Sequence, residues 1–213
     1  MRRIVHVTSR PKPVTPGAAA ASDSAPVIPK MPEVKEALKS GFRDSDALVR
    51  AVSIDIAGRI REKSVIPELI ESLKDPLHFI RQKAAQTLGF IGERKAVPAL
   101  IEALNDPSEE VRVTVAGVLG HLKDRLAVPP LIIAMRDKSP HTRMKAAISL
   151  GCLADKKAVP ALAAALKDDN ELVRKYACEA LGNLGKDAVA PLLNALKDDK
   201  LRALATESLM KIK

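Results

Sequence analysis

From residue 31 onward, the apolar residues recur at helical spacing in blocks of two. In one block, positions i, i+3, i+4 and i+7 form the apolar face of a first helix and are occupied by Ile66, Leu69, Ile70 and Leu73. Pro67 falls in the first turn of this helix, where a missing N–H costs nothing. A second helical face follows after a turn and consists of Ile80, Ala84, Ala85, Leu88 and Ile91. The pattern predicts pairs of short helices.

These blocks repeat with a period of 31 residues, as shown by Pro67, Pro98, Pro129 and Pro160. A two-helix unit of this size leaves apolar surface on both flanks, so it is stable only when stacked against its neighbours. We therefore predict an all-α protein, a right-handed α-solenoid of six two-helix repeats. Their expected ranges are 31–64, 65–95, 96–126, 127–157, 158–187 and 188–213.

Residues 1–30 lack this pattern and contain five of the fifteen prolines. Such a segment cannot bury enough surface to offset its ordering entropy. We expect a flexible, basic, Pro/Ala-rich leader that is extended or disordered. Its Ile4–Val7 run could add as a strand to the sheet edge of a partner, and whether the leader orders on binding is left open.

The repeated motif D-x-x-x-x-V-R-x-x-A-A-x-x-L-G-x-L-G, followed by A-V-P-x-L, resembles the HEAT-like repeats of the phycobilisome-lyase type. The resemblance covers residues 31–213 and implies an α-solenoid. It leaves the function open, because such repeats serve scaffolds, binding proteins and a few enzymes.

Three residue types recur in the same column of successive repeats, which indicates a structural role. An Asp lies six residues before each Arg, from Asp44 and Arg50 to Asp168 and Arg174. We expect these pairs to form a ladder of charge-assisted hydrogen bonds, within a repeat or to the next one. A Gly lies eight residues after each Arg, inside the second helix. Glycine costs about 1 kcal/mol relative to Ala there, so we expect close approach of the adjacent helix.

Catalytic and metal-binding motifs are absent from the sequence. The histidines His6, His78, His121 and His141 stand in different columns without metal-ligand spacing. HEAT-repeat deoxyhypusine hydroxylases bind iron through paired His-Glu motifs, and this chain has none. Cys178 takes a small core position, and nothing near Cys152 would activate its thiol. We predict no catalytic residues, no metal and no cofactor, and hence a protein that is not an enzyme.

The variable columns of the second helices are the candidate binding site, because these helices line the concave surface of such solenoids. They combine apolar residues, one tyrosine and a polar rim, which is the composition of a protein-binding surface. The predicted partner-binding residues are Gln82, Lys83, Gln86, Val113, Thr114, Met144, Lys145, Ile148, Lys175, Tyr176 and Glu179.

The leading hypothesis is therefore a scaffold or adaptor that holds a protein partner of unknown identity in its concave groove. One alternative is a bilin lyase or chromophore-handling subunit, although three Phe and one Tyr offer few rings for a tetrapyrrole. The net charge of +9 allows a second alternative, weak nucleic-acid binding through the leader and the basic fourth repeat. The charge forms no continuous stripe, so nucleic acid is the less favoured partner.

The last repeat is shortened and brings Leu201, Leu204, Leu209, Met210 and Ile212 close together. Because solenoid ends need polar caps, we expect this end to favour a homodimer or a docked partner; the oligomeric state is left open. No run approaches the roughly 18 apolar residues of a membrane span, and two cysteines cannot build a disulfide framework. We expect a cytoplasmic protein.

Overall fold

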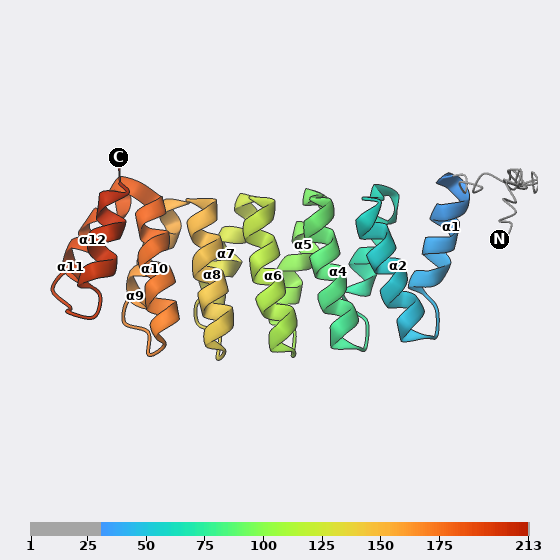
Figure 1. Ribbon diagram of the computed structural model, residues 1–213, viewed down its shortest axis with the longest axis horizontal. Coiled ribbons are helices and arrows are strands. Elements are labelled where there is room, and N and C mark those ends of the chain that lie inside the picture. Colours follow the sequence, from blue (N-terminus) through green and yellow to red (C-terminus); the bar gives the residue numbers. More distant parts are fainter. Residues whose placement is uncertain (1–30, 213) are drawn as a thin grey trace, which may run out of the picture. The chain divides into compact units, whose positions relative to one another are not determined.

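The computed structural model describes residues 31–212, and in this part of the chain all regular structure is helical (Figure 1). The α-helices are α1 (Met31–Phe42), α2 (Ala47–Arg59), α3 (Ile66–Ser72), α4 (His78–Ile91), α5 (Val97–Glu102), α6 (Glu109–Leu122), α7 (Val128–Ala134), α8 (Pro140–Leu153), α9 (Val159–Ala165), α10 (Glu171–Leu184), α11 (Val189–Ala195) and α12 (Arg202–Met210). The predicted leader, residues 1–30, and Lys213 lie outside the described residues.

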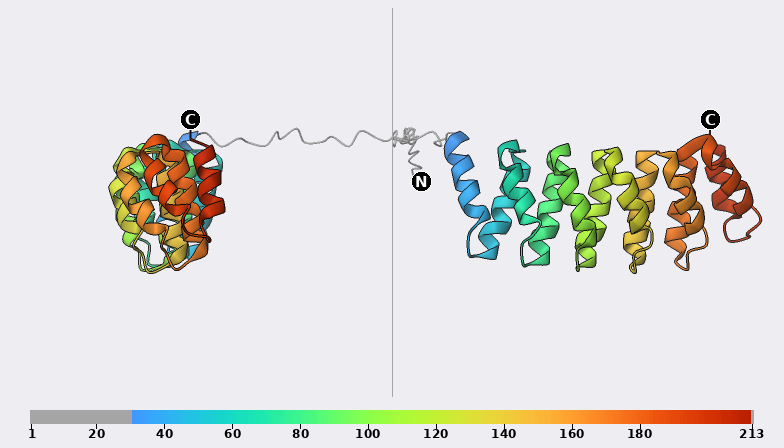
Figure 2. Two further views of the ribbon diagram at one scale, coloured as in Figure 1. Left: turned by 90° about the vertical axis from the view of Figure 1, so that its left-hand side faces the viewer. Right: turned by 180° about the vertical axis from the view of Figure 1, so that it is seen from behind.

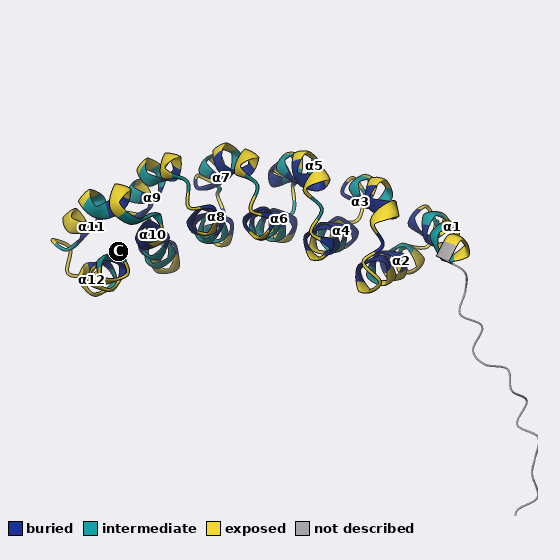
Figure 3. Cartoon of the chain, turned by 90° about the horizontal axis from the view of Figure 1, so that it is seen from above, coloured by how far each residue is buried: buried dark blue, intermediate teal, exposed yellow. Residues whose placement is uncertain are grey.

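The helices form two layers, as the view along the stack from above shows (Figure 3). The odd-numbered helices make the outer, convex layer, and the even-numbered helices make the inner, concave layer. From α2 to α12, successive even-numbered helices pack against one another, and the view from behind shows the same succession of pairs (Figure 2). The predicted right-handed α-solenoid of six helix pairs is confirmed, and its second helices line the concave face.

One apolar core runs between the two layers for the whole length of the array. The outer helices contribute a fully buried leucine from the same column in each of five repeats, namely Leu69, Leu100, Leu131, Leu162 and Leu192. The inner helices supply a matching series, namely Leu88, Leu119, Leu150 and Leu181. Since all these leucines belong to one buried cluster, the repeats share a single core.

A ladder of ion pairs crosses the repeats along the turns between paired helices. In its best-buried rung, Arg81 donates from Nε and Nη2 to the two carboxylate oxygens of Asp106, at 2.6 and 2.7 Å. The Nη1 of the same arginine donates to the carbonyl oxygens of Asp75 and Pro76 in its own turn. Each arginine therefore binds the carboxylate of the next repeat and the backbone of its own. The same bidentate rung joins Arg50 to Asp75, Arg112 to Asp137 and Arg143 to Asp168.

Three carboxylates of the ladder, those of Asp106, Asp137 and Asp168, have a pKa below the ordinary value. The hydrogen bonds from Arg143, against the effect of burial, and the backbone N–H of Asn170 lower the pKa of Asp168 below its ordinary value. Burial acts to raise the pKa of Asp106, but the hydrogen bonds from Arg81 and Ser108 outweigh it and lower the pKa. A lowered folded-state pKa means stability that is complete above the unfolded value of about 3.9 and is lost as the pH falls through the folded value.

The ladder stops at the fifth repeat. Arg174 donates to the carbonyl oxygens of Asp168 and Asp169, at 2.8 and 2.9 Å, as its counterparts do in their own turns. Among residues 31–212, however, no carboxylate pairs with it. Asp198, the last residue of the Asp column, accepts the backbone N–H of Lys200, while Asp199 pairs with Arg202. The shortened last repeat therefore lacks the rung that joins the others.

Glycines in the inner helices allow these helices to approach closely. A Cβ atom on Gly120 would lie 2.6 Å from Cβ and 2.8 Å from Cα of Ser149 in α8. A Cβ atom on Gly151 would lie 2.9 Å from Cα of Ala180 in α10. Real Cβ atoms do not come this near to a neighbouring backbone, so the contact offsets the low helix propensity of glycine.

We predict that Arg112→Gln destabilises the protein by about 3 kcal/mol at neutral pH, because it leaves Asp137 half-buried without its counter-ion. Arg174→Gln is the matched control, since it loses the same two carbonyl contacts but no carboxylate, and it should cost clearly less. Urea unfolding at neutral and acidic pH measures both. The difference between the variants should shrink as the pH falls below about 4. Equal costs at neutral pH would show that the rungs add nothing.

We predict that Gly120→Ala destabilises the protein by about 1–3 kcal/mol, since the methyl group meets the backbone of α8. Gly117→Ala in the same helix is the matched control. Its methyl group would meet the flexible stem of Lys145, with Cδ at 3.2 Å, so the higher helix propensity of Ala should leave stability unchanged or raise it by up to about 1 kcal/mol. Thermal unfolding of both variants measures this; a stabilised Gly120→Ala contradicts the packing argument.

Candidate functional site

The predicted partner-binding residues all lie on α4, α6, α8 and α10, the central helices of the inner layer (Figure 3). Gln86 is exposed, and the other ten are half-buried. The half-burial arises because positions one, two and five after each ladder arginine lie between adjacent inner helices. We call these eleven residues the concave stripe. The structure places them on four successive inner helices, and it also gives part of them a role in the stack.

Two contacts within the stripe join neighbouring repeats. The Nε2 of Gln82 donates to Oγ1 of Thr114 at 3.2 Å, from α4 to α6. The Nζ of Lys83 donates to both carboxylate oxygens of Asp55 in α2, at 2.7 and 2.9 Å. The lysine is about one-third exposed and Asp55 more so, and such an exposed pair contributes little to stability. These groups orient one another and remain accessible to a partner.

Three further side chains lie against neighbours. The stem of Lys145 runs along Gly117 of the preceding inner helix, which leaves its ammonium group at the surface. The Nζ of Lys175 lies 5.6 Å from the ring centre of Tyr176, within the range of a cation–π contact. Both Met144 and Tyr176 pack against the core. These last two are therefore poorer candidates for direct contact with a partner than the sequence suggested.

An exposed aromatic residue next to the stripe was missed by sequence reasoning. Phe90 follows Gln82 and Gln86 at intervals of four residues on α4, and 55% of its side chain is exposed. The guanidinium carbon of Arg61, from the preceding repeat, lies 4.7 Å from the centre of its ring. Phe90 stands in a column otherwise filled by His121, Cys152 and Asn183, and this variation is a signal that could have found it.

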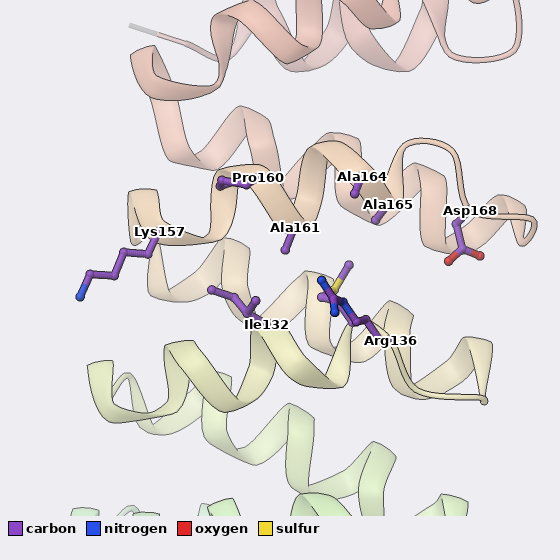
Figure 4. A pocket seen from close by; sticks show the side chains of 9 residues that line it. Ile132, Arg136, Lys157, Pro160, Ala161, Ala164, Ala165 and Asp168 are labelled. Carbon is purple, nitrogen blue, oxygen red and sulfur yellow. The ribbon is translucent and has the colours of Figure 1, made fainter.

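A pocket of about 360 Å³ lies on the other face of the array, between the outer helices α7 and α9 (Figure 4). Ile132, Ala161 and Ala164 form its apolar walls, while Arg136 and Asp168 stand at one end and Lys157 at the other. Its size would admit a small ligand, so its position in the repeat matters.

Corresponding columns line other hollows in the outer layer, and the one between α9 and α11 is larger, at about 430 Å³. Ile70, Lys74, Ala99 and Asp106 line a hollow of about 180 Å³ between α3 and α5, and each stands 62 residues before a residue of the α7–α9 pocket. Further hollows lie between α1 and α3 and between α9 and α11. Because the curvature spreads the outer helices at every step, these hollows are features of the stack and not a specific site.

Chemically reactive groups do not gather within residues 31–212. No three His, Cys, Asp or Glu side chains of this part of the chain converge as a metal site would need. Burial raises the pKa of the Cys178 thiol, which opposes formation of a nucleophilic thiolate. Cys152 is exposed on the inner layer. None of the helices formed by these residues has the length and apolar content needed to cross a membrane.

Comparisons with known proteins agree with this architecture. A chain of the complex of CpcE and CpcF of phycocyanin lyase from Nostoc sp. PCC7120 is 27% identical, with a TM-score of 0.62 over 81% of this chain and 74% of that one. A designed armadillo repeat protein in complex with the peptide (KR)4 is 17% identical, with a TM-score of 0.61 over 83% and 98%. An engineered protein is 18% identical, with a TM-score of 0.61 over 84% and 96%.

No curated protein matches the sequence. The family model for HEAT repeats matches three overlapping stretches, residues 34–108, 97–171 and 146–210. Together these stretches span nearly the whole described array, and the glycine column and the paired helices recur in all of them. The chain therefore belongs to the HEAT-repeat family, with HEAT-like repeats of the phycobilisome-lyase type.

Proposed function

We propose that the protein is a non-enzymatic scaffold that binds a segment of a protein partner along the concave stripe. The observation that carries this proposal is the contrast between two sets of side chains. The ladder and the glycine contacts recur in repeat after repeat and hold the stack together. The concave stripe differs in chemistry from repeat to repeat, so its residues are free to match one particular partner.

The composition of the stripe supports an extended or helical polypeptide as the ligand. Val113 and Ile148 are half-buried apolar residues on adjacent helices, and neither belongs to the core or to the side chains packed on it. Gln86 beyond them is exposed, and the ammonium groups of Lys145 and Lys175 border the same face. An apolar centre with a hydrogen-bonding and charged rim is the usual anatomy of a protein-binding surface.

The comparisons support the same class of function. The 27% identical chain comes from a complex of two proteins, CpcE and CpcF, so a solenoid of this type is compatible with a protein partner. For the present chain, the proposal specifies only the class of partner, a protein. A small-molecule site is less favoured, because the hollows in the outer layer recur with the repeat.

Nucleic-acid binding is not favoured by the placement of the basic residues of the fourth repeat. Arg143 is occupied by Asp168, and Lys145 lies on the concave face against Gly117. Arg136 and Lys157 line the outer pocket (Figure 4). The positive charges therefore face different directions, whereas a phosphate backbone requires a continuous basic track.

We predict that Val113→Glu/Ile148→Glu reduces recovery of the partner about tenfold or more, since both carboxylates enter the apolar centre of the stripe. The measurement is quantitative mass spectrometry of proteins that co-purify with the tagged chain from its native cells. These positions are preferable to Met144 and Tyr176, whose side chains pack on the core, because their substitution leaves the fold less affected.

The matched control is Ile133→Glu/Leu193→Glu, which places two carboxylates at exposed apolar positions of the outer helices α7 and α11. This control should recover the partner as the wild type does. Helicity and unfolding midpoint should agree between both variants and the wild type. Equal recovery by the stripe variant and the control contradicts a partner site on the concave face.

The similarity to a chain of the phycocyanin lyase complex makes bilin handling the second candidate function. Phe90 is the exposed ring beside the stripe, and one exposed ring offers little stacking surface for a tetrapyrrole. We predict that the purified protein leaves the absorption spectrum of added free bilin unchanged. A red-shifted or sharpened band that Phe90→Ala abolishes would favour the bilin function instead.

A further inference from the structure

Each of the inner helices α4, α6 and α8 turns one side, its flank, towards the repeat before it. The positions that lie on this flank can be identified from their contacts with that repeat. Two residues after the ladder arginine, Lys83 reaches back to Asp55. Six residues after the arginine, Thr87, Val118 and Ser149 each lie against the glycine of the preceding inner helix. Helix α2 carries the same columns, but no inner helix precedes it among residues 31–212.

On α2 these columns are apolar and uncovered. Val49 is 40% exposed, whereas Ile80, Val111 and Val173 in the same column are fully buried. Ile56 and Ile60 are 41% and 44% exposed, whereas their counterparts one repeat later, Thr87 and Ile91, are both 7% exposed. Val52 is 54% exposed, and Leu48 is 70% exposed, in a column whose members Phe79 and Leu172 are also exposed. We call these five residues, Leu48, Val49, Val52, Ile56 and Ile60, the α2 flank.

At the opposite end of the array, most large apolar side chains of α12 and its flanking residues are covered. Leu201 is buried, and Leu204, Leu209 and Ile212 pack against the core, which leaves Met210 as the exposed apolar side chain of α12. Met210 stands eight residues after Arg202, in the column that holds glycine in the interior repeats. A methionine there blocks the close approach by which repeats stack, so this end does not receive the α2 flank of a second copy head to tail.

Charge on the α2 flank favours a two-fold arrangement instead. Asp46 caps the N-terminus of α2 through a hydrogen bond from the N–H of Leu48, and Arg59 lies exposed in the last turn. Arg59 stands in the column of Asn183, whose side chain lies next to Gly151 of the preceding repeat. Two α2 helices packed antiparallel would bring Arg59 of each copy towards the oppositely charged Asp46 that caps the other helix. Val52 would then face Ile56 across the axis.

We propose that a second copy of this chain covers the α2 flank through an antiparallel, two-fold packing of α2 on α2. Such an interface is isologous and closes on itself, so it yields a dimer and not a filament. It covers the flank of α2 that, in the interior repeats, lies against the preceding inner helix. The proposal does not depend on the identity of the partner on the concave stripe.

The experiment is analytical ultracentrifugation of the full chain over a range of concentrations, applied to the wild type, to two single variants and to their mixture. The wild type should be a dimer. Val52→Lys and Ile56→Glu should each raise the dissociation constant about a hundredfold, because each would bury an unpaired charge. Mixing the two variants should restore the dimer, since the introduced lysine of one copy then faces the introduced glutamate of the other and the second contact stays apolar.

Ile133→Glu is the matched control, because this residue is as exposed as those of the α2 flank but lies on the outer layer; it should remain dimeric. Helicity by circular dichroism establishes that each variant is folded. A monomeric wild type, or a dimer indifferent to both single variants, overturns the proposal and leaves the flank to another kind of partner. Failure of the mixed variants to associate overturns the antiparallel arrangement.

Discussion

The array depends on one arginine side chain in each of four repeats, which binds two turns at once. Its Nη1 group closes the turn of its own repeat through two carbonyl oxygens, and its remaining N–H groups bind the carboxylate of the next repeat, as Arg112 does with Asp106, Pro107 and Asp137. The carboxylate in turn accepts the backbone N–H of Ser139. Because folding one turn prepares the acceptor for the preceding arginine, local structure and stacking are formed by the same atoms.

Because of this coupling, two repeated contacts determine the distance between neighbouring inner helices. The ladder fixes the turn end of each repeat, and the glycine column allows the inner helices to meet backbone to side chain, as between Gly120 and Ser149. The outer helices have no such column and leave hollows between them. Close packing inside and looser packing outside curve the array, and this curvature places the variable residues on a concave face (Figure 3).

The sequence was sufficient for the fold because the repeat displays each structural column several times. It predicted the ladder but left open whether the carboxylate belongs to the same or the next repeat, since a turn does not fix where an arginine points. It also missed the left-handed residue that follows α2, α4, α6 and α8. Gly92 suggests it after α4, yet Arg61, Lys123 and Ala154 adopt a similar positive φ without glycine. The half-burial of Met144 and Tyr176 depends on the distance between helices, which cannot be read from the aligned repeat sequences.

Recurrence within the chain separates structure from recognition only in the interior, where every column has a neighbour on both sides. At the first repeat, a column that is buried elsewhere becomes exposed: Ile80 and Val111 are buried, whereas Val49 in the same column is exposed. An apolar residue retained at an end is therefore not explained by the stack. At the last repeat, Met210 replaces the glycine that would admit another helix. Among residues 31–212, the two terminal repeats thus differ: the last carries Met210 in the glycine column, and the first carries exposed apolar side chains on α2.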